Sequence, residues 1–360
     1  MKKLMIRTAA ALMAAVLLLP CQAKAVSAQK AIVLDGETGR ILYERDADSK
    51  SLIASCTKIM TALVVAEQCN VLDRVEIPKE AVGIEGSSMY LKEGEVLTVQ
   101  ELLYGLMLHS GNDAAVALAI YCGGTVEGFA GLMNDKAHRL GLTGTHFENP
   151  HGLDSPNHYS TARDLAVLAA YAMKDPIFRQ TVSTKSVRVG QRQLTNHNKL
   201  LWQVEGAEGV KTGYTKAAGR ILVSSAVRDG RRLICVTIND GNDWADHATL
   251  LEDGFSRYHV RSLVEEGTVL GTRFVLSGEA DTVELVAAED FRFSLAQEEA
   301  PTIVISGTGF AYAPVVRGQQ AGYAYICLGD EVVGKVRLIY GSTVEQKKEE
   351  KKHFWEGWFS

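Results

Sequence analysis

The order of apolar patterns between about residues 30 and 260 constrains the fold of this chain more than any other feature. Residues 30–46 alternate apolar and polar positions around a turn that contains glycine, which predicts two paired strands. Strand patterns return after residue 186, most clearly at residues 209–215, 220–227 and 232–238. Because elements from both ends of a segment can complete one layer, we expect a single antiparallel sheet that is closed by the return of the chain.

The section between these strand patterns has the spacing and length of helices. Thr98 and Glu101 form a capping box, which predicts the start of one helix, and Ser160 or Thr161 is expected to cap another. Helices packed on an antiparallel sheet make an α+β domain, whose limits fall near residues 30 and 260. The expected helices lie at residues 53–67, 98–108, 112–121, 126–140, 162–173 and 243–260.

The sequence changes character after residue 260. Residues 261–340 contain short alternating runs, such as TVELVA and TIVISG, separated by Gly, Asp and Glu, which predicts a small all-β domain resembling a sandwich. The length of 360 residues agrees with two domains, because one domain typically takes about 100–200 residues. Residues 341–360 form a basic and aromatic tail.

The N-terminus has the pattern of an export signal. Basic residues precede an apolar run from Thr8 to Pro20, and Ala23 and Ala25 then supply the small residues of a cleavage site. The run is shorter than the roughly 20 residues that a membrane-spanning helix needs, so a retained anchor is less well supported. We therefore expect residues 1–25 to be a signal peptide and the mature protein to be exported.

Composition argues against several classes of function. The 38 basic and 43 acidic residues give a net charge of −5 without a basic stripe, so no nucleic acid partner is expected. Five of the six cysteines follow the predicted signal peptide, in mostly apolar stretches and without CxxC spacing. We expect them to be small buried hydrophobic side chains rather than a disulfide framework, and we predict neither a metal nor a cofactor.

Ser55 and Lys58 carry the first chemical signal. They lie three residues apart in a helical pattern, so they share a face and can touch. Serine is a poor nucleophile unless a base takes its proton, and a lysine can be that base only when its amine is neutral. Because the reference pKa of lysine is about 10.4, burial or a second cation must lower it. The SxxK pattern alone is weak, since about one copy is expected by chance.

Two further motifs make the signal specific. An SxN motif begins at Ser110, and the chain's one KTG motif begins at Lys211, where about a tenth of one is expected by chance. SxxK, SxN and KTG in this order match the signature of penicillin-binding proteins and β-lactamases. Longer segments, including ASCTKIMTALVVAE, LLYGLMLHSGNDAAVALA and GVKTGYTKAAGRILVSSA, resemble the low-molecular-mass penicillin-binding proteins, the serine D-alanyl-D-alanine carboxypeptidases of peptidase family S11. The resemblance extends from about residue 30 to residue 340.

This resemblance implies a serine β-lactamase/DD-peptidase-like domain and a set of catalytic roles. Ser55 would attack the carbonyl between the last two D-alanines of a peptidoglycan stem peptide and form an acyl-enzyme that water hydrolyses. Lys58 would be the general base, and Ser110 would pass a proton to the leaving amine. β-Lactam antibiotics would then be covalent inhibitors.

The resemblance also implies the binding residues. Asn112 would hold the peptide's amide and the neighbouring lysine, whereas Lys211 and Thr212 would bind the terminal carboxylate. The oxyanion hole would use the backbone N–H groups of Ser55 and Tyr214.

Four residues near these motifs need an interpretation of their own. Gly213 is expected because a strand that the substrate approaches closely gains from lacking a Cβ. Cys56 adjoins the predicted nucleophile but points about 100° around the helix, which favours packing over catalysis. His151 and His158 are expected to order the loop NPHGLDSPNHYSTA by hydrogen bonding.

Several alternative functions remain open. A D,D-endopeptidase would cut cross-links, although such relatives generally lack the C-terminal β domain. A class A β-lactamase needs a carboxylate for deacylation, usually a Glu four residues before an Asn, and none lies between Asn112 and Lys211. A wall-binding protein without catalysis would be expected to lack Ser55, Lys58 or Lys211. Without HExxH or GxSxG, a zinc peptidase or an α/β-hydrolase is poorly supported.

The tail allows a peripheral membrane contact. In a helix, Phe354, Trp355, Trp358 and Phe359 would lie on one side, beside several lysines, as in segments that lie in a membrane interface. Gly357 interrupts the pattern, and such a short anchor would bind weakly. Membrane contact and a frayed tail therefore both remain open.

Overall fold

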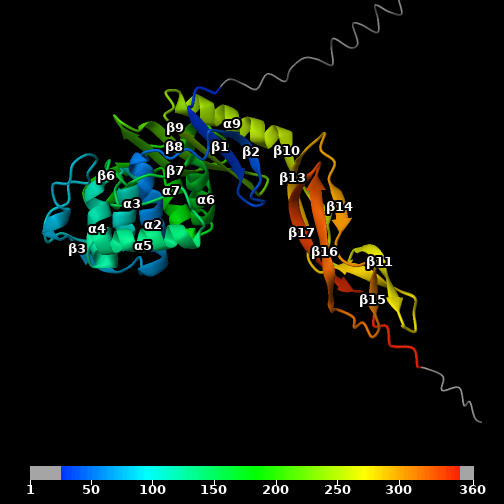
Figure 1. The fold of residues 1–360 in the computed structure, drawn as a ribbon. Coiled ribbons are helices and arrows are strands. Elements are labelled where there is room, and N and C mark those ends of the chain that lie inside the picture. The colour runs from blue at the N-terminus through cyan, green and yellow to red at the C-terminus, as the bar shows by residue number, and fades with distance from the viewer. Residues whose placement is uncertain (1–25, 349–360) are drawn as a thin grey trace, which may run out of the picture. The chain divides into compact units, whose positions relative to one another are not determined.

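The computed structural model describes residues 26–348, which form two compact units divided between Phe255 and Ser256 (Figure 1). The predicted fold class is confirmed, because the first unit combines an antiparallel sheet with helices and the second is built from strands. The predicted signal peptide, residues 1–25, and residues 349–360 of the expected tail lie outside the described residues.

The sheet of the first unit contains five antiparallel strands in the order β2-β1-β9-β8-β7. Strand β1, at the start of the unit, pairs with β9 near its end, and Val33 lies opposite Cys235 in this pairing. The return of the chain thus completes the sheet, as the sequence predicts. Its strands are β1 Lys30–Asp35, β2 Ile41–Arg45, β7 Ala207–Thr215, β8 Gly219–Arg228 and β9 Arg231–Ile238.

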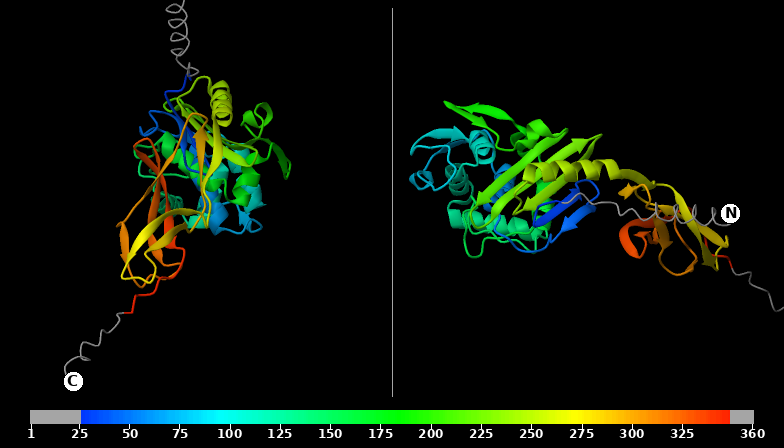
Figure 2. Two further views of the ribbon diagram at one scale, coloured as in Figure 1. Left: turned by 90° about the vertical axis from the view of Figure 1, so that its right-hand side faces the viewer. Right: turned by 90° about the horizontal axis from the view of Figure 1, so that it is seen from above.

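Helices cover both faces of this sheet. Helix α9 lies on one face, and the helical middle section lies on the other (Figures 1 and 2). Because successive strand side chains point to opposite faces, Ile32 and Leu34 pack with the middle section, whereas Ala31 and Val33 pack in the cluster that includes Leu250 of α9. The helices are α2 Lys58–Gln68, α3 Val99–Leu108, α4 Asn112–Gly123, α5 Val126–Arg139, α6 Ala162–Ala172, α7 Pro176–Ser183, α8 Leu200–Gln203 and α9 Asp243–Arg257.

The predicted helix caps are confirmed at two positions. Thr98 and Glu101 form a reciprocal capping box at the start of α3. The side chain of Thr161 accepts a hydrogen bond from the backbone N–H of Asp164 at the start of α6. These local signals are reliable because the first N–H groups of a helix lack intrahelical partners.

The structure differs from the sequence prediction at two helices. The segment expected as one helix from residue 53 begins with a 3-10 turn, η1 Ala54–Thr57, because Ala54 has a left-handed φ of 45°. The helix expected to reach residue 260 ends at Arg257, and strand β10 begins at Tyr258. Strands β5 Ser186–Val189 and β6 Arg192–Thr195 lie where the strand patterns were expected to return. Elements that the prediction missed in the first unit are η2 Lys79–Ala81, α7, α8 and the strands β3 Arg74–Glu76 and β4 Val96–Thr98.

The second unit has a six-stranded sheet in the order β14-β16-β17-β12-β11-β15 and a two-stranded sheet of β10 and β13. Alternate side chains of these strands, such as Val283 and Leu285, form its apolar core. Its strands are β10 Tyr258–Val264, β11 Val269–Leu276, β12 Thr282–Ala287, β13 Phe291–Ala296, β14 Thr302–Ile305, β15 Phe310–Tyr312, β16 Gln320–Leu328 and β17 Glu331–Tyr340.

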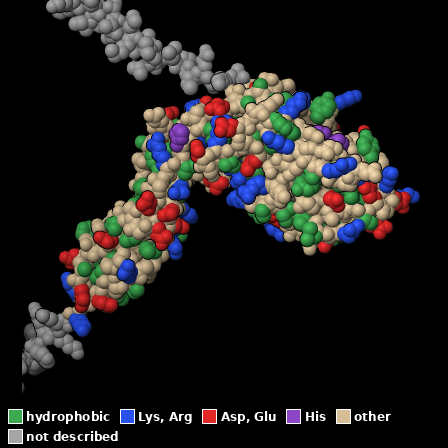
Figure 3. Space-filling view, turned by 180° about the vertical axis from the view of Figure 1, so that it is seen from behind, with side chains coloured by type: hydrophobic (Ala, Val, Ile, Leu, Met, Phe, Trp, Pro, Cys, Tyr) green, Lys and Arg blue, Asp and Glu red, His purple; other side chains and the backbone are tan. Residues whose placement is uncertain are grey.

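The surface carries charges of both signs. On the face shown in Figure 3, basic and acidic side chains are interspersed over both units. Among residues 26–348, no single helix has the length and apolar character to cross a membrane, and only α4 and α5 together, bent by 82°, pass that test.

Candidate active site

Ser55 and Lys58 meet where the 3-10 turn η1 passes into helix α2. In a 3-10 turn, side chains three residues apart lie directly above one another. The Lys58 Nζ atom accordingly lies 3.0 Å from the Ser55 Oγ atom. The structure therefore brings the two residues of the SxxK motif into hydrogen-bond contact, through tighter local geometry than the predicted α-helix.

The Lys58 amine has two further neighbours, and both are carbonyl oxygens. Its Nζ atom lies 2.7 Å from Oδ1 of Asn112 and 2.7 Å from the backbone oxygen of His151. A neutral amine has two N–H groups and one lone pair, and these oxygens can only accept hydrogen bonds. When both N–H groups are used in this way, the lone pair is left for the hydroxyl proton of Ser55.

The orientation of Asn112 is set by a second contact. Its Nδ2 atom donates a hydrogen bond to the backbone oxygen of Glu85, which leaves Oδ1 toward Lys58. Asn112 is the first residue of α4, and its own N–H donates to the oxygen of Ser87 at 2.7 Å. The segment around residues 85–87 therefore positions the amide that contacts the lysine.

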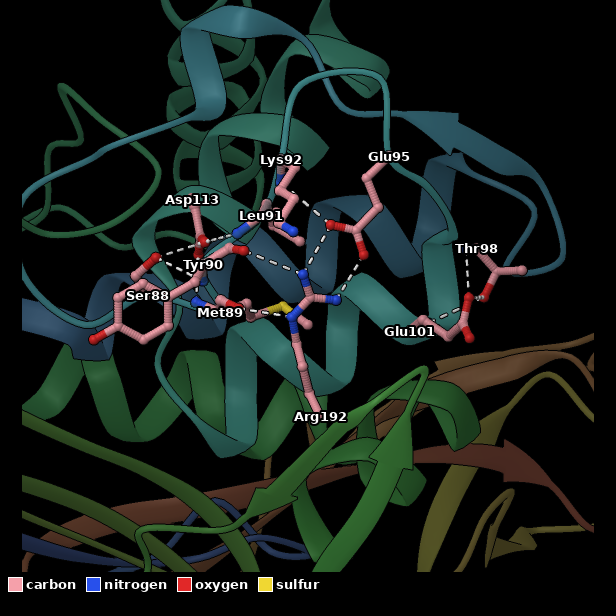
Figure 4. A network of polar contacts seen from close by, with 10 residues as sticks. All are labelled: Ser88, Met89, Tyr90, Leu91, Lys92, Glu95, Thr98, Glu101, Asp113 and Arg192. Atoms are coloured by element: carbon pink, nitrogen blue, oxygen red, sulfur yellow. Dashed lines mark hydrogen bonds and ion pairs between the residues drawn. The ribbon is translucent and has the colours of Figure 1, made fainter.

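A polar network holds this segment in place (Figure 4). The buried Asp113 carboxylate accepts hydrogen bonds from the Ser88 hydroxyl at 2.6 Å and from the Met89 N–H at 2.9 Å. Arg192 of β6 forms an ion pair with Glu95 and donates to the Met89 oxygen at 2.7 Å. Groups on α4 and β6 thus fix the loop that orients Asn112.

The loop at residues 146–160 supports the other side of Lys58. His158 contacts the Thr57 hydroxyl through Nε2 at 2.7 Å and accepts the N–H of Glu148 at Nδ1, while His151 Nδ1 accepts the N–H of Leu153. The expected ordering role of both histidines is confirmed by these bonds. Gly152, with φ of 88°, packs so closely on η1 that a Cβ would lie 1.9 Å from the Ala54 oxygen.

The KTG motif lies on β7, at the edge of the sheet. Lys211 is 2% exposed, and its Nζ atom donates to the Thr212 oxygen at 2.8 Å. The strand packs against η1: a Cβ on Gly213 would lie 3.2 Å from the Ile53 oxygen. The absence of a Cβ at Gly213 thus also accommodates the turn that carries the serine, and the expected close approach of the substrate stays a prediction.

Cys56 packs in the same contact. Its side chain is fully buried, and its thiol donates a weak hydrogen bond to the Lys211 oxygen at 3.8 Å. Burial raises the pKa of this thiol to about 12, although Lys211 and Lys58 act in the opposite direction. The thiol stays protonated at neutral pH, which agrees with a packing role.

The pKa values of both buried lysines are lowered. Burial lowers the pKa of Lys58 well below its ordinary value, and the positive charge of Lys211 lowers it further. Burial also lowers the pKa of Lys211, to about 8. Both shifts favour a neutral amine, and two causes act in this direction on Lys58.

A cleft of about 330 Å³ opens above these lysines. Ser110 borders it in a left-handed conformation with φ of 63°, a strained backbone that is common at functional sites. All three motifs contribute residues to the lining, whereas the buried Lys58, Asn112 and Lys211 are not among the lining residues. The lining residues are Ser55, Ser87, Ser110, His197, Thr212, Gly213, Tyr214, Arg220, Ile221, Asp243 and Trp244.

One group in this cleft has no signal in the sequence. Arg220 of β8 forms a two-point ion pair with Asp243 at the start of α9, at 2.7 and 2.8 Å, and its guanidinium lies 5.8 Å from the Trp244 ring. Asp243 is 3% exposed, whereas the Arg220 side chain is 44% exposed. No local spacing connects these residues, so their pairing depends on the packing of α9 beside β8.

Within residues 26–348, no three His, Cys, Asp or Glu side chains are grouped as a metal site requires. A serine bonded to a buried lysine, with a second buried lysine on a neighbouring edge strand, is typical of serine hydrolases that use lysine as their base. The fold and this site together place the chain in that class of enzyme.

Family comparisons agree with this class. Residues 19–242 match the D-alanyl-D-alanine carboxypeptidase family, peptidase S11, and residues 258–346 match the C-terminal domain of penicillin-binding protein 5. The chain therefore belongs to peptidase family S11. The predicted family is confirmed, and so is the enzyme class, a serine-type D-alanyl-D-alanine carboxypeptidase.

Individual relatives match both units. The chain is 34% identical to the D-alanyl-D-alanine carboxypeptidase DacC of Escherichia coli, over 90% of this chain and 86% of the relative. It is 31% identical to DacF of Bacillus subtilis, over 86% and 83%. Penicillin-binding protein 5 of Haemophilus influenzae has a similar structure, with a TM-score of 0.78 at 30% identity over 89% of this chain and 98% of that one.

Proposed function

We propose that this enzyme removes the terminal D-alanine from peptidoglycan stem pentapeptides through an acyl-enzyme at Ser55. Lys58 takes the hydroxyl proton while Oγ attacks the carbonyl carbon between the last two D-alanines, and the terminal D-alanine leaves as an amine. Water then hydrolyses the ester. The observation that carries this proposal is the environment of Lys58, whose Nζ atom lies 3.0 Å from the Ser55 Oγ atom and 2.7 Å from each of two carbonyl oxygens.

The remaining roles follow from charge and position. Lys211, charged near neutral pH, and the Thr212 hydroxyl bind the substrate carboxylate, and Ser110 passes a proton to the leaving amine. Asn112 holds Lys58 and the peptide's amide. The backbone N–H groups of Ser55 and Tyr214 stabilise the oxyanion, and such donors are commonly worth about 100-fold to 1000-fold each. An extended peptide adds along the β7 edge of the sheet.

β-Lactams acylate Ser55 in this proposal and are released slowly. The one carboxylate among the described cleft-lining residues is Asp243, and Arg220 holds both of its oxygens. Glu148, in the neighbouring loop, accepts hydrogen bonds from Ser155 and Asn157 instead. Neither carboxylate is placed as a free base for deacylation, so the drug acts as an inhibitor rather than a substrate.

The decisive experiment compares a pentapeptide with a cross-linked dimer. D-Alanine release from the pentapeptide is expected, with little cleavage of the dimer, whereas preferential cleavage of the dimer would identify an endopeptidase. Ser55→Ala should abolish covalent uptake of fluorescent penicillin. Cys56→Ala is the matched control, because it changes the adjacent buried side chain and should still be labelled. Labelling of Ser55→Ala would refute the nucleophile assignment.

We also infer that the mature enzyme acts at the cell wall or the outer face of the cytoplasmic membrane. Residues 1–25 direct export, and the basic and aromatic tail touches the membrane surface. The mass of the secreted N-terminus tests cleavage after Ala25 or Ala28. Removing residues 349–360 should lower binding to anionic lipid vesicles without changing penicillin labelling, and unchanged vesicle binding would exclude the tail as the contact.

A further inference from the structure

Helices α2 and α4 meet at both of their ends. At their N-terminal ends, Lys58 and Asn112 are joined by the 2.7 Å hydrogen bond of the active site. At their C-terminal ends, Cys69 directly follows α2, and Cys122 is the last residue but one of α4. The two helices pack against each other between these points.

The two cysteines are within reach of one another. Each thiol shifts the pKa of the other, upward at Cys69 and downward at Cys122, as expected for neighbouring sulfurs. Cys122 Sγ also lies 3.8 Å from Oε1 of Gln68, the residue before Cys69. One residue away, the Tyr121 hydroxyl donates to Asp73 at 2.8 Å, so several contacts hold the end of α4 beside the chain that leaves α2.

This pair differs from the two other described cysteines of the first unit. Cys69 and Cys122 are half-buried, whereas Cys56 and Cys235 are completely buried. The neighbouring Cys69 lowers the pKa of Cys122, although partial burial opposes this, while burial raises the pKa of Cys56 to about 12. A thiolate is the attacking species in disulfide exchange, so Cys122 is the more reactive partner.

We propose that Cys69 and Cys122 form a disulfide when the protein meets an oxidising thiol–disulfide compound. The Cys122 thiolate attacks one sulfur of the external disulfide RSSR and releases one RS⁻. The Cys69 thiolate then attacks the Cys122 sulfur of the mixed disulfide and releases the second RS⁻. Two protein thiols are oxidised, one external disulfide is reduced, and the two thiol protons pass to the released thiolates.

The bond would join two helices that each deliver a residue to the catalytic lysine contact. A disulfide restricts the unfolded chain, and its stabilising effect is larger for longer loops. The proposal does not depend on the catalytic roles, because both cysteines lie at the helix ends away from the cleft. It revises the expectation that all five cysteines are only small buried hydrophobic side chains.

Peptide mapping tests the bond directly. Trypsin is expected to release Cys69 in residues 59–74 and Cys122 in residues 93–136, and neither peptide holds another cysteine. The purified protein is incubated with oxidised or reduced glutathione, its free thiols are alkylated, and the digest is analysed by mass spectrometry. We expect the two peptides to be linked after oxidation and both alkylated after reduction. Separate alkylated peptides after oxidation, or a link to any other cysteine, would overturn the proposal.

Single variants test the order of steps and the effect on stability. Cys69→Ser should trap glutathione on Cys122, whereas Cys122→Ser should leave Cys69 largely unmodified. In the unsubstituted protein, oxidation should raise the melting temperature of the first unit by roughly 5–10 °C. Cys327→Ser, which changes a half-buried cysteine of the second unit, is the matched control and should keep both the link and the shift. If oxidation raised the melting temperature of Cys122→Ser as much as that of the control, the proposal would be contradicted.

Discussion

The two units of this enzyme differ in the kind of polar group that they bury. The first unit buries titratable side chains, among them Lys58, Lys211, Asp113 and His247. In the second unit, the buried charged group among the described residues is Arg273, a side chain that stays protonated in proteins. Burying an ionisable group costs free energy unless it is paired or neutral, so each of these groups needs specific partners or a shifted pKa.

The contacts of these groups show the same difference. Lys58 meets a hydroxyl, an amide oxygen and a backbone oxygen, and its pKa is lowered by burial and by Lys211. Arg273 donates to the backbone oxygens of Ala321 and Ser306 and therefore ties strands and loops together. The buried Lys58 thus contacts the proposed nucleophile, whereas the buried Arg273 satisfies backbone oxygens.

The largest expected effect comes from removing the base. Lys58→Ala should reduce the rate of acylation by penicillin roughly 10⁴-fold or more, because the serine proton then has no acceptor. Circular dichroism and the unfolding midpoint should show a folded protein.

Lys136→Met provides the matched control. Lys136 is also buried, and burial alone would lower its pKa, but its contacts with Glu67 and Tyr171 outweigh this and raise it. Lys136 forms an ion pair with Glu67 and has no role in the proposed reaction, so penicillin should acylate its variant at the original rate. Equal losses in the two variants would mean that buried lysines matter here only for the fold.

The next largest effect is expected in the pH dependence of kcat/KM. Activity requires neutral Lys58 and charged Lys211, so kcat/KM should fall on the acid side as Lys58 gains a proton and on the alkaline side near pH 8 as Lys211 loses one. Lys211→Ala should lower kcat/KM roughly 100-fold to 1000-fold and remove the alkaline decline.

The same variant tests the coupling between the lysines. Without the charge of Lys211, the pKa of Lys58 should rise, which moves the acid limb of the profile to higher pH. Full pH profiles of kcat/KM for both proteins measure this shift. An acid limb that stays in place would show that burial alone sets the protonation of Lys58.

The sequence predicted the parts of this site that depend on side-chain type and short spacing. The strand pairs, the capped helices and the three motifs all have local patterns, and the structure places the motifs around one cleft. The carbonyl oxygens of His151 and Glu85 could not be predicted, because every residue has such an oxygen. The pairing of Arg220 with Asp243 also left no signal, since it requires the docking of α9 on the sheet.

A smaller effect is expected on the stability of the first unit at acid pH. His247 is completely buried, lies 2.6 Å from the Ser224 hydroxyl and 3.0 Å from the Thr237 hydroxyl, and burial lowers its pKa to about 3. The unfolded chain binds a proton at ordinary histidine pKa, so stability is lost as pH falls from about 6.5 toward 3, by roughly 1.4 kcal/mol per pH unit. Urea unfolding at several pH values should show a shallower loss in His247→Gln. Identical slopes would assign the acid sensitivity to other groups, such as His151 and His158.

The smallest effect on activity is expected from the second unit. Arg273→Met removes the donor for the Ala321 and Ser306 oxygens, and unpaired buried carbonyls should destabilise this unit by roughly 1–3 kcal/mol. Hydrogen exchange followed by mass spectrometry should show faster exchange in residues 258–346 and unchanged exchange around Lys58. Because no group of the second unit takes part in the proposed chemistry, penicillin acylation should change less than about twofold. A tenfold loss of acylation would show that the buried charge of the second unit influences catalysis, and the contrast between the units would then no longer hold.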